Sequence, residues 1–325
     1  LDRLLALSHA LFPALSHELA DLTGIDNHYT VCGGIELAGP ADVDADEWRG
    51  PGVAVEPLTP SRLAALEPAV SPDLAPALRI PDLSQLRNPR HLQALRAACL
   101  ATGKVELRED ARVMDVDVID GQAQGIRLAN EYLVGGAVLL AAGAWTARLL
   151  TQLGRPIGVA LGPGQIVLLD PGRPLFRHVL LCGARYLVPR RDGRVLIGST
   201  EEHVGFDKAT TAAGVQGLLE LGMRLVPALA DAAIERTWAG LRPGSPDGLP
   251  ILGLVPGIAR LYVGTGHFRA GIQLSPGTAQ CLKELILGQP PTLALEAFRM
   301  DPPSLNESHG AARRETDESP RRHDG

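Results

Sequence analysis

The sequence is poor in aromatic residues and has no excess of positive charge. Phe, Trp and Tyr make up 4% of its 325 residues, and the formal net charge is −6 at pH 7. This balance argues against nucleic acid as the main partner, because binding to a phosphate backbone requires a basic face. No apolar run reaches the roughly 18 residues that a membrane span requires. We therefore expect neither a nucleic-acid partner nor a membrane partner.

Cysteine is also scarce. Cys32, Cys99, Cys182 and Cys281 lie far apart, without a CxxC motif and without a Cys/His pair at metal-ligand spacing. This usage is typical of reduced, mostly buried thiols in a cytoplasmic protein, with disulfides as an open alternative. We predict no metal site.

What the sequence does contain is typical of a soluble globular protein. Hydrophobic residues make up 45% and charged residues 21%, and the length suffices for one large domain or two. Apolar residues recur at helical spacing in several segments, and short alternating runs lie between turn residues. The predicted helices cover residues 2–22, 61–67, 89–102, 145–153, 213–225 and 279–287. The predicted strands cover residues 29–38, 105–108, 112–119, 124–128, 132–134, 137–142, 165–169, 179–181, 185–189, 195–198, 232–238 and 260–264.

These elements predict an α/β (α+β) chain made of two interleaved kinds of structure. Helices and buried strands over 88–150 and 239–290 favour a nucleotide-binding type of sheet, in which the apolar run AVLLAA at 137–142 is a parallel strand. Paired strands over 25–85 and 155–238 favour a second, antiparallel sheet. Two further segments lack such patterns: residues 40–57 predict an acidic surface loop, and residues 301–325 a disordered tail.

A Gly-rich segment follows one predicted strand and precedes a helix. Gly264–Gly271 reads GTGHFRAG, which misses the GxGxxG fingerprint because Arg269 occupies the position of the third Gly. A loop that only turns the chain is as good an interpretation as a ligand cradle. His267, within this segment, is either a core histidine or a ligand-side one.

Three polar side chains are candidates for binding an anion. Arg242 lies in a segment with few acidic neighbours, and Arg269 has apolar neighbours, so each could bind a carboxylate. An exposed surface arginine is an equally good interpretation of Arg242. Tyr186 begins the run YLVPR, where a core tyrosine is the simpler interpretation. Likewise, the small residues Ala142 and Gly143 are explained by tight strand-to-helix packing as well as by a cofactor edge.

Four blocks of the sequence carry a resemblance to a known family. They resemble the FAD-dependent amino acid oxidases, and most closely the bacterial glycine oxidases of thiamine biosynthesis, followed by sarcosine-oxidase-like proteins. The similarity extends over nearly all of residues 1–300. The blocks are VLLAAGAWT (138–146), YLVPRRDGRVLIGSTEE (186–202), WAGLRPGSPDGLPILG (238–253) and GHFRAGIQLSPGTA (266–279).

The resemblance implies a two-domain flavoenzyme whose cofactor is FAD. The FAD-binding domain would comprise residues 1–24, 86–154 and 239–298, and the substrate domain residues 25–85 and 155–238. Family members begin with a strand, a GxGxxG turn and a helix that bind the ADP half of FAD. This chain starts downstream of that unit, so we expect an N-terminally truncated sequence with a Rossmann-like domain that lacks its first βαβ unit.

The resemblance also implies roles for individual residues. Arg242, Arg269 and Tyr186 correspond to the residues that bind the substrate carboxylate. Val113 corresponds to a strand residue on the adenosine side of FAD, and Ala142 and Gly143 lie at the cofactor edge. The segment that wraps the flavin ring would comprise His267, Phe268, Arg269, Ala270, Gly271, Ile272 and Gln273.

The implied reaction is hydride transfer from the α-carbon of glycine or another small amino acid or amine to FAD. O2 then reoxidises the flavin and yields H2O2, and no catalytic acid or base is predicted. Two alternatives stay open: an FAD-dependent amino acid dehydrogenase, and a non-catalytic remnant that binds small carboxylates. A homo-oligomer is also open.

Overall fold

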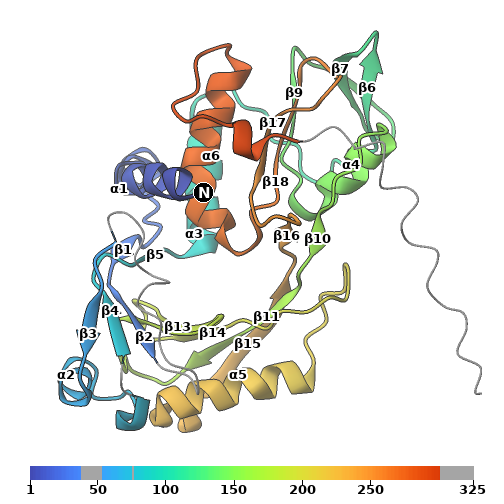
Figure 1. Cartoon of the computed structure of the whole chain (residues 1–325). Coiled ribbons are helices and arrows are strands. Elements are labelled where there is room, and N and C mark those ends of the chain that lie inside the picture. The colour runs from blue at the N-terminus through green and yellow to red at the C-terminus, as the bar shows by residue number, and fades with distance from the viewer. Residues whose placement is uncertain (38–52, 75–76, 301–325) are drawn as a thin grey trace, which may run out of the picture.

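The computed structural model of the chain describes residues 1–37, 53–74 and 77–300. It is a mixed α/β fold in which helices α1, α3 and α6 gather in one half and a large curved sheet with α2 and α5 forms the other (Figure 1). The predicted tail at 301–325 and most of the predicted loop at 40–57 lie outside the described residues. The α-helices are α1 (Asp2–Thr23), α2 (Pro60–Leu66), α3 (Asn88–Ala101), α4 (Thr146–Gln152), α5 (Ala212–Leu225) and α6 (Gly271–Ile286).

The large sheet has eight strands in the order β15-β11-β14-β13-β12-β2-β4-β3, and all its pairs are antiparallel except β12 with β2. Its main core lies between one face of the sheet and α5, where Leu187, Ile197 and Leu218 are fully buried. Side chains alternate along a strand, so Tyr186 and Gly198 lie on the opposite face. The strands are β2 (Gly34–Leu37), β3 (Glu56–Leu58), β4 (Ala77–Ile80), β11 (Gly164–Asp170), β12 (Val179–Cys182), β13 (Arg185–Pro189), β14 (Val195–Gly198) and β15 (Ala233–Gly240).

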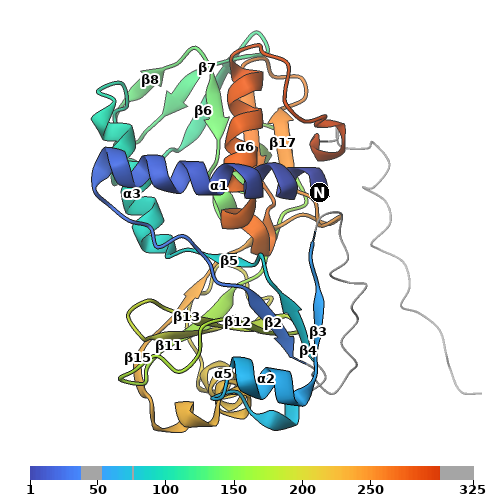
Figure 2. The same ribbon diagram turned by 90° about the vertical axis from the view of Figure 1, so that its left-hand side faces the viewer.

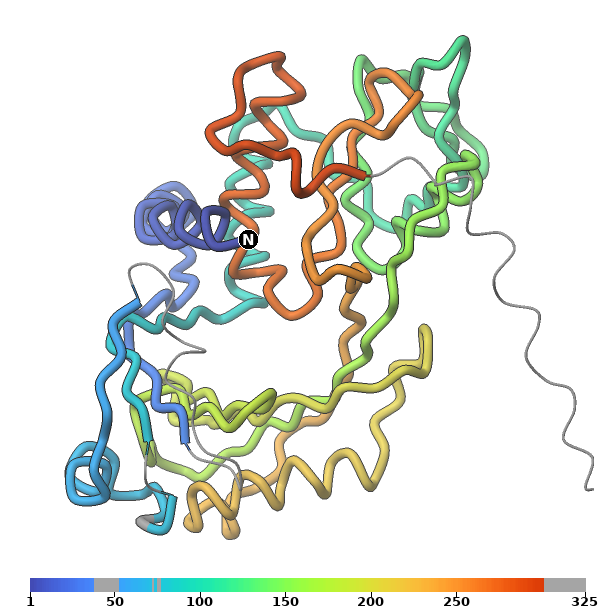
Figure 3. The backbone as a smooth tube through the Cα atoms, viewed as in Figure 1, coloured from blue at the N-terminus to red at the C-terminus, as the bar shows by residue number. Residues whose placement is uncertain are grey.

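A second sheet of three strands has the order β17-β18-β9. Strand β18 (Leu261–Thr265) pairs in parallel with β9 (Val138–Leu140) and antiparallel with β17 (Ile251–Leu254). The parallel pair confirms the character predicted for the AVLLAA run, although β9 is the edge strand and Leu139 is 41% exposed. The backbone trace shows this sheet beside α6 (Figure 3).

A three-stranded antiparallel sheet adjoins this half. It contains β6 (Asp115–Ile119), β7 (Gln122–Arg127) and β8 (Tyr132–Val134). Asp120 and Gly121 join the first two strands with φ angles of 50° and 71°, which are the positive values that a tight hairpin turn requires. An Asp-Gly pair is a typical sequence signal for such a turn. Four short strands form two further pairs: β1 (Thr30–Val31) with β5 (Ser84–Gln85), and β10 (Ala160–Leu161) with β16 (Pro243–Gly244).

Helix α1 lies across α6, as the view turned by 90° shows (Figure 2). Its buried residues Leu4, Ser8, Phe12, Ser16 and Leu19 recur every three or four positions, which is the spacing of one helix face. Ser8 donates from Oγ to the carbonyl of Leu274 (3.2 Å) and accepts from the amide of Gly277 (3.0 Å). A Cβ at Gly277 would lie 2.6 Å from this hydroxyl, so glycine permits the close crossing.

Several sequence predictions were wrong in detail. Residues 105–108 form no strand, and Val105 and Leu107 are 41% and 43% exposed. Strand β3 occupies part of the predicted loop, and β17 was missed because its Gly and Pro neighbours resemble a turn. The cysteines are free, as predicted, yet only Cys281 is buried.

Helix α6 begins at Gly271, two turns before the predicted start at Ala279. Pro276 lies inside this helix, and proline lacks the N–H that would bond to the carbonyl four residues earlier. That carbonyl belongs to Ile272, and the Ser275 hydroxyl donates to it at 2.8 Å. The serine thus replaces the missing donor and the helix continues through the proline.

Candidate active site

Arg242 follows β15, and its guanidinium reaches back over the sheet. Nη1 donates to the carbonyls of Gly162 (3.4 Å) and Thr200 (3.3 Å), and Nη2 donates to the Ser199 hydroxyl. Burial lowers the pKa of Arg242, with an opposing effect of Tyr186 and Glu201 and a further lowering by Arg269. Arginine still remains a cation at neutral pH. None of the described carboxylates forms an ion pair with this half-buried cation, so it is available to an anionic ligand.

Glycine makes room for this arrangement at two positions. A Cβ at Gly164 would collide with the Arg242 guanidinium, and a Cβ at Gly198 would lie 2.7 Å from the ring of Tyr186. Both side chains therefore lie flat on the sheet, in contact with backbone. A larger residue at either position would displace the group that the sequence predicted to bind substrate.

Tyr186 and Arg269 lie near Arg242 but come from different elements. Tyr186 is on β13, opposite Gly198 of β14, and its hydroxyl makes no hydrogen bond within the described residues. Arg269 belongs to the short 3-10 turn Phe268–Ala270, donates from Nη2 to the Ala184 carbonyl, and places Nη1 3.6 Å from Oε2 of Glu201. The fold thus brings together the three predicted substrate residues.

The segment His267–Gln273 is not a loop throughout. Phe268–Ala270 form the 3-10 turn, and Gly271, Ile272 and Gln273 are the first residues of α6. Phe268 has a positive φ of 48°, and a Cβ at Gly162 would lie 2.8 Å from its ring. His267 places Nε2 3.0 Å from the Thr278 hydroxyl, and burial lowers the pKa of the imidazole, which favours its neutral form.

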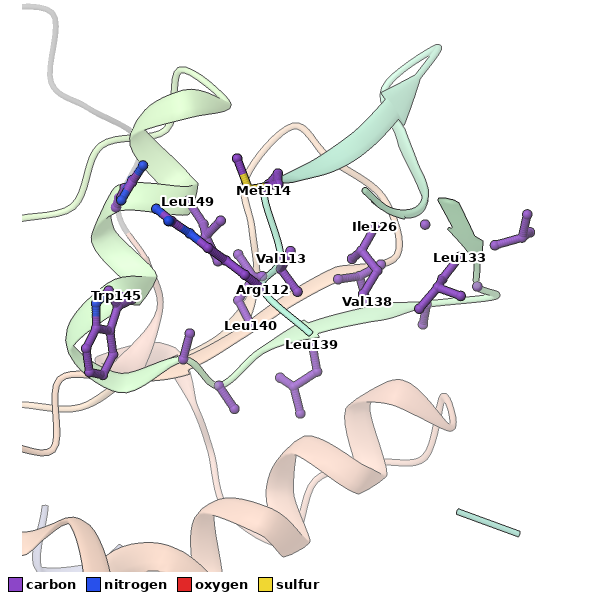
Figure 4. Close-up of a pocket in the computed structure, with 17 residues that line it drawn as sticks. Arg112, Val113, Met114, Ile126, Leu133, Val138, Leu139, Leu140, Trp145 and Leu149 are labelled. Carbon is purple, nitrogen blue, oxygen red and sulfur yellow. The ribbon is translucent and has the colours of Figure 1, made fainter. Parts of the chain in front are cut away.

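Two other predicted cofactor residues line a cavity beside β9. Val113 and Ala142 line a cavity of about 890 Å³, a size within the usual range of small-molecule sites, roughly 300–1,000 Å³. Val113 precedes β6 and is not in a strand, contrary to expectation. The cavity is mostly apolar and includes Leu139 and Trp145, with Arg112 and Arg148 as its cations (Figure 4).

Gly143 lies between the cavity that Ala142 lines and the segment that begins at His267. Its carbonyl accepts a hydrogen bond from the Thr265 hydroxyl at 3.1 Å, and Thr265 ends β18 two residues before His267. The ends of the parallel strands β9 and β18 thus lie next to each other, which is where ligands bind in open α/β sheets. The cavity ends at Ala142, directly before Gly143, and its mostly apolar lining with Arg112 and Arg148 fits FAD, which carries aromatic rings and anionic phosphates.

Several residues of the site were not identified from the sequence. Ser199 and Thr200 hold Arg242, and Glu201 pairs with Arg269. Buried Gln165 fixes their segment: Nε2 donates to Glu202 Oε1 (2.6 Å), and the Thr200 hydroxyl donates to the same oxygen (2.7 Å). A signal existed, since STEE at 199–202 places four polar residues directly after a buried strand.

None of the described helices is long and apolar enough to cross a bilayer. The sites, the domain boundaries and the cytoplasmic location stay predictions.

Comparisons with known proteins agree with this geometry. Residues 1–285 match the family described as FAD dependent oxidoreductase, DAO. Glycine oxidase from Pseudomonas putida is 34% identical over 289 residues, which cover 88% of this chain and 79% of that protein. The hydrogen cyanide synthase subunit HcnC from Pseudomonas aeruginosa is 35% identical over 290 residues, 86% of this chain and 69% of that protein.

Solved structures extend this result to the fold. Glycine oxidase from Geobacillus kaustophilus superimposes with a TM-score of 0.85 at 33% identity, covering 91% of this chain and 82% of that one. Iminodiacetate oxidase from Chelativorans sp. BNC1 gives a TM-score of 0.80 at 28% identity, with 91% and 82% covered. The chain therefore belongs to the DAO family of FAD-dependent oxidoreductases, with glycine oxidases among its relatives.

Proposed function

We propose that this protein oxidises glycine or another small amino acid in an FAD-dependent reaction. The observation that carries the proposal is Arg242, a half-buried cation held by Ser199, Thr200 and Gly162 and paired with none of the described carboxylates. A guanidinium bound this way matches a carboxylate ligand, since its fork can donate two parallel hydrogen bonds. The names of the glycine oxidase relatives support an amino acid as the ligand.

The side chains around Arg242 would fix the orientation of such a substrate. Tyr186 lies on the same face of the sheet with a free hydroxyl, which could donate to a carboxylate oxygen held by Arg242. Arg269 approaches from the opposite half of the molecule and closes the site beside Glu201. Holding the carboxylate at a fixed position determines which α-carbon C–H bond faces the cofactor.

FAD would lie along the cavity wall of Val113 and Ala142, with its ring end toward the segment His267–Gln273. When bound, it supplies the hydride acceptor for the α-carbon, and O2 restores its oxidised form and becomes H2O2. The neutral His267, bonded to Thr278, adds no charge beside the ring. Arg112 and Arg148 are placed to neutralise anionic groups at the cavity. Loss of the hydride from the α-carbon and of a proton from nitrogen leaves an imine, and O2 takes up that hydride and proton as H2O2. Water then hydrolyses the imine to a 2-oxo acid and ammonia.

A peroxide assay with purified protein and added FAD tests this function. We expect flavin absorbance to stay with the protein after desalting, and glycine to yield equal amounts of ammonia and H2O2. Arg242→Ala should lose turnover, and Arg236→Ala, an exposed arginine on β15, should keep it. Bound flavin that reduces a dye without forming peroxide would favour the dehydrogenase instead. Absence of both flavin and turnover would favour the non-catalytic alternative.

A further inference from the structure

Glu201 is an acidic side chain in a site built around two arginines. Its Oε2 lies 3.6 Å from Nη1 of Arg269, and the side chains of the pair are 42% and 31% exposed, respectively. Its charge also acts on Arg242, opposing the effect of burial on that guanidinium. The Glu201 carboxylate therefore interacts electrostatically with both candidate substrate arginines, and it remains accessible to solvent.

The backbone on both sides of Glu201 is fixed. The amide of Thr200 donates to the Gln165 carbonyl (3.3 Å), and the amide of Glu202 donates to the Pro163 carbonyl (3.0 Å). The neighbouring carboxylate, Glu202, points into the protein and accepts from Gln165 and Thr200. Glu202 is therefore not available to pair with Arg269, and Glu201 is the acidic group that faces this arginine.

The charges of the site determine what ligand fits it. Arg242 is paired with none of the described carboxylates and can bind the carboxylate of a ligand. The positive charge of Arg269 is already paired with the carboxylate of Glu201. A second carboxylate would meet Arg269 already paired and would lie beside Glu201, where like charges repel.

We propose that Glu201 determines specificity: by pairing with Arg269 it restricts the site to ligands with one carboxylate and disfavours those with a second. This proposal rests on the proposed function for the choice of Arg242 as the carboxylate site. It predicts a preference for glycine over iminodiacetate, which is glycine with an additional carboxymethyl group on nitrogen.

Ligand binding tests the proposal without requiring turnover. Acetate and malonate differ by one carboxylate, and calorimetry on the purified protein, with and without FAD, gives a Kd for each. In Glu201→Gln we expect malonate to bind at least tenfold more tightly than in the original protein, with the acetate Kd changed less than about threefold. Glu235→Gln is the matched control, because Glu235 is an exposed partner of Arg194 elsewhere on the sheet, and should change neither Kd.

A double variant tests the part played by Arg269. If Glu201 acts by pairing with Arg269, Glu201→Gln combined with Arg269→Gln should lose the gain in malonate binding. An equal gain in that background would overturn the pairing mechanism. An unchanged malonate-to-acetate ratio in Glu201→Gln, or no binding of either ligand to any of these proteins, would overturn the proposal.

Kinetics separate this inference from the proposed function. With turnover, Glu201→Gln should raise kcat/KM for iminodiacetate relative to glycine about tenfold. If Glu201→Gln shifts the malonate-to-acetate binding ratio and the protein yields no peroxide, the result would support the role of Glu201 and reject the proposed oxidase function.

Discussion

Two regions differ in what holds their side chains: the arginine site, which contains Arg242, Arg269 and Tyr186, and the β9 cavity, which Val113 and Ala142 help to line. Around Arg242, side chains and carbonyls form hydrogen bonds at close range, and glycines leave room for the groups that they contact. The cavity is lined mainly by apolar side chains along β9, which pairs only with β18 within the described residues. The arginine site is therefore preorganised by the chain, whereas the cavity wall offers apolar surface with few fixed contacts.

Replacing Arg242 should produce the largest effect on the arginine site. Truncating a hydrogen-bonded charged partner costs about 2–5 kcal/mol. We therefore expect Arg242→Ala to raise KM for an amino acid roughly 30-fold or more, at about 1.4 kcal/mol per tenfold, with flavin content unchanged. Steady-state kinetics and the flavin spectrum measure both quantities. An unaltered KM would refute the role of Arg242 as the carboxylate residue.

Gln165 tests whether the arginine site depends on its buried network. Its side chain is fully buried, donates to Glu202 and Thr211, and accepts from the Thr211 amide at 2.9 Å. Gln165→Leu removes these three hydrogen bonds, although Glu202 keeps the one from Thr200 and the Thr211 hydroxyl keeps the one from the Gly214 amide. Each lost bond contributes about 0.5–1.5 kcal/mol, and more where the partner is charged. We expect a loss of roughly 2–4 kcal/mol in denaturant unfolding.

Gln216 provides the control for this variant. Among the described residues its side chain bonds only to Glu220, on the exposed face of α5, so Gln216→Leu should change the free energy of unfolding by less than about 0.5 kcal/mol. Equal effects of the two variants would show that the Gln165 network contributes no more than surface contacts do.

Neighbouring leucines of β9 test the cavity side of the comparison. Both line the cavity, but Leu139 is 41% exposed, whereas Leu140 is 5% exposed and also belongs to a hydrophobic core cluster. Leu140→Ala should cost about 2–5 kcal/mol of unfolding free energy, and Leu139→Ala less than about 1 kcal/mol. Denaturant titration measures both. Similar losses would mean that the cavity wall is as tightly packed as the core.

Local patterns in the sequence predicted most elements of this fold. The apolar spacing of α1, the Thr59 cap of α2 and the Asp120-Gly121 turn depend on neighbouring residues, and all three are present. Residues 105–108 also have a strand pattern, but no described strand pairs with them. A strand requires a partner, and periodicity within one segment does not supply that information.

The residues of the candidate site also divide into those that the sequence predicted and those that it did not. Arg242, Arg269 and Tyr186 were found because their blocks resemble a family, and the fold brings them together. Gln165, Ser199 and Glu201 were not found, because their roles depend on contacts between β11, β14 and the turn before α6. The family resemblance identified the candidate ligand-binding groups, whereas the groups that position them required three-dimensional coordinates.

The close crossing of α1 and α6 has a consequence for protein synthesis. The ribosome makes α1 well before α6, so the α1 face with Leu4 and Ser8 stays uncovered by α6 until that helix emerges. Helices α1 and α6 meet where Ser8 contacts Leu274 and Gly277, one to two turns after His267–Ala270. The nascent chain therefore exposes an apolar helix until that segment emerges, and such intermediates are prone to aggregation.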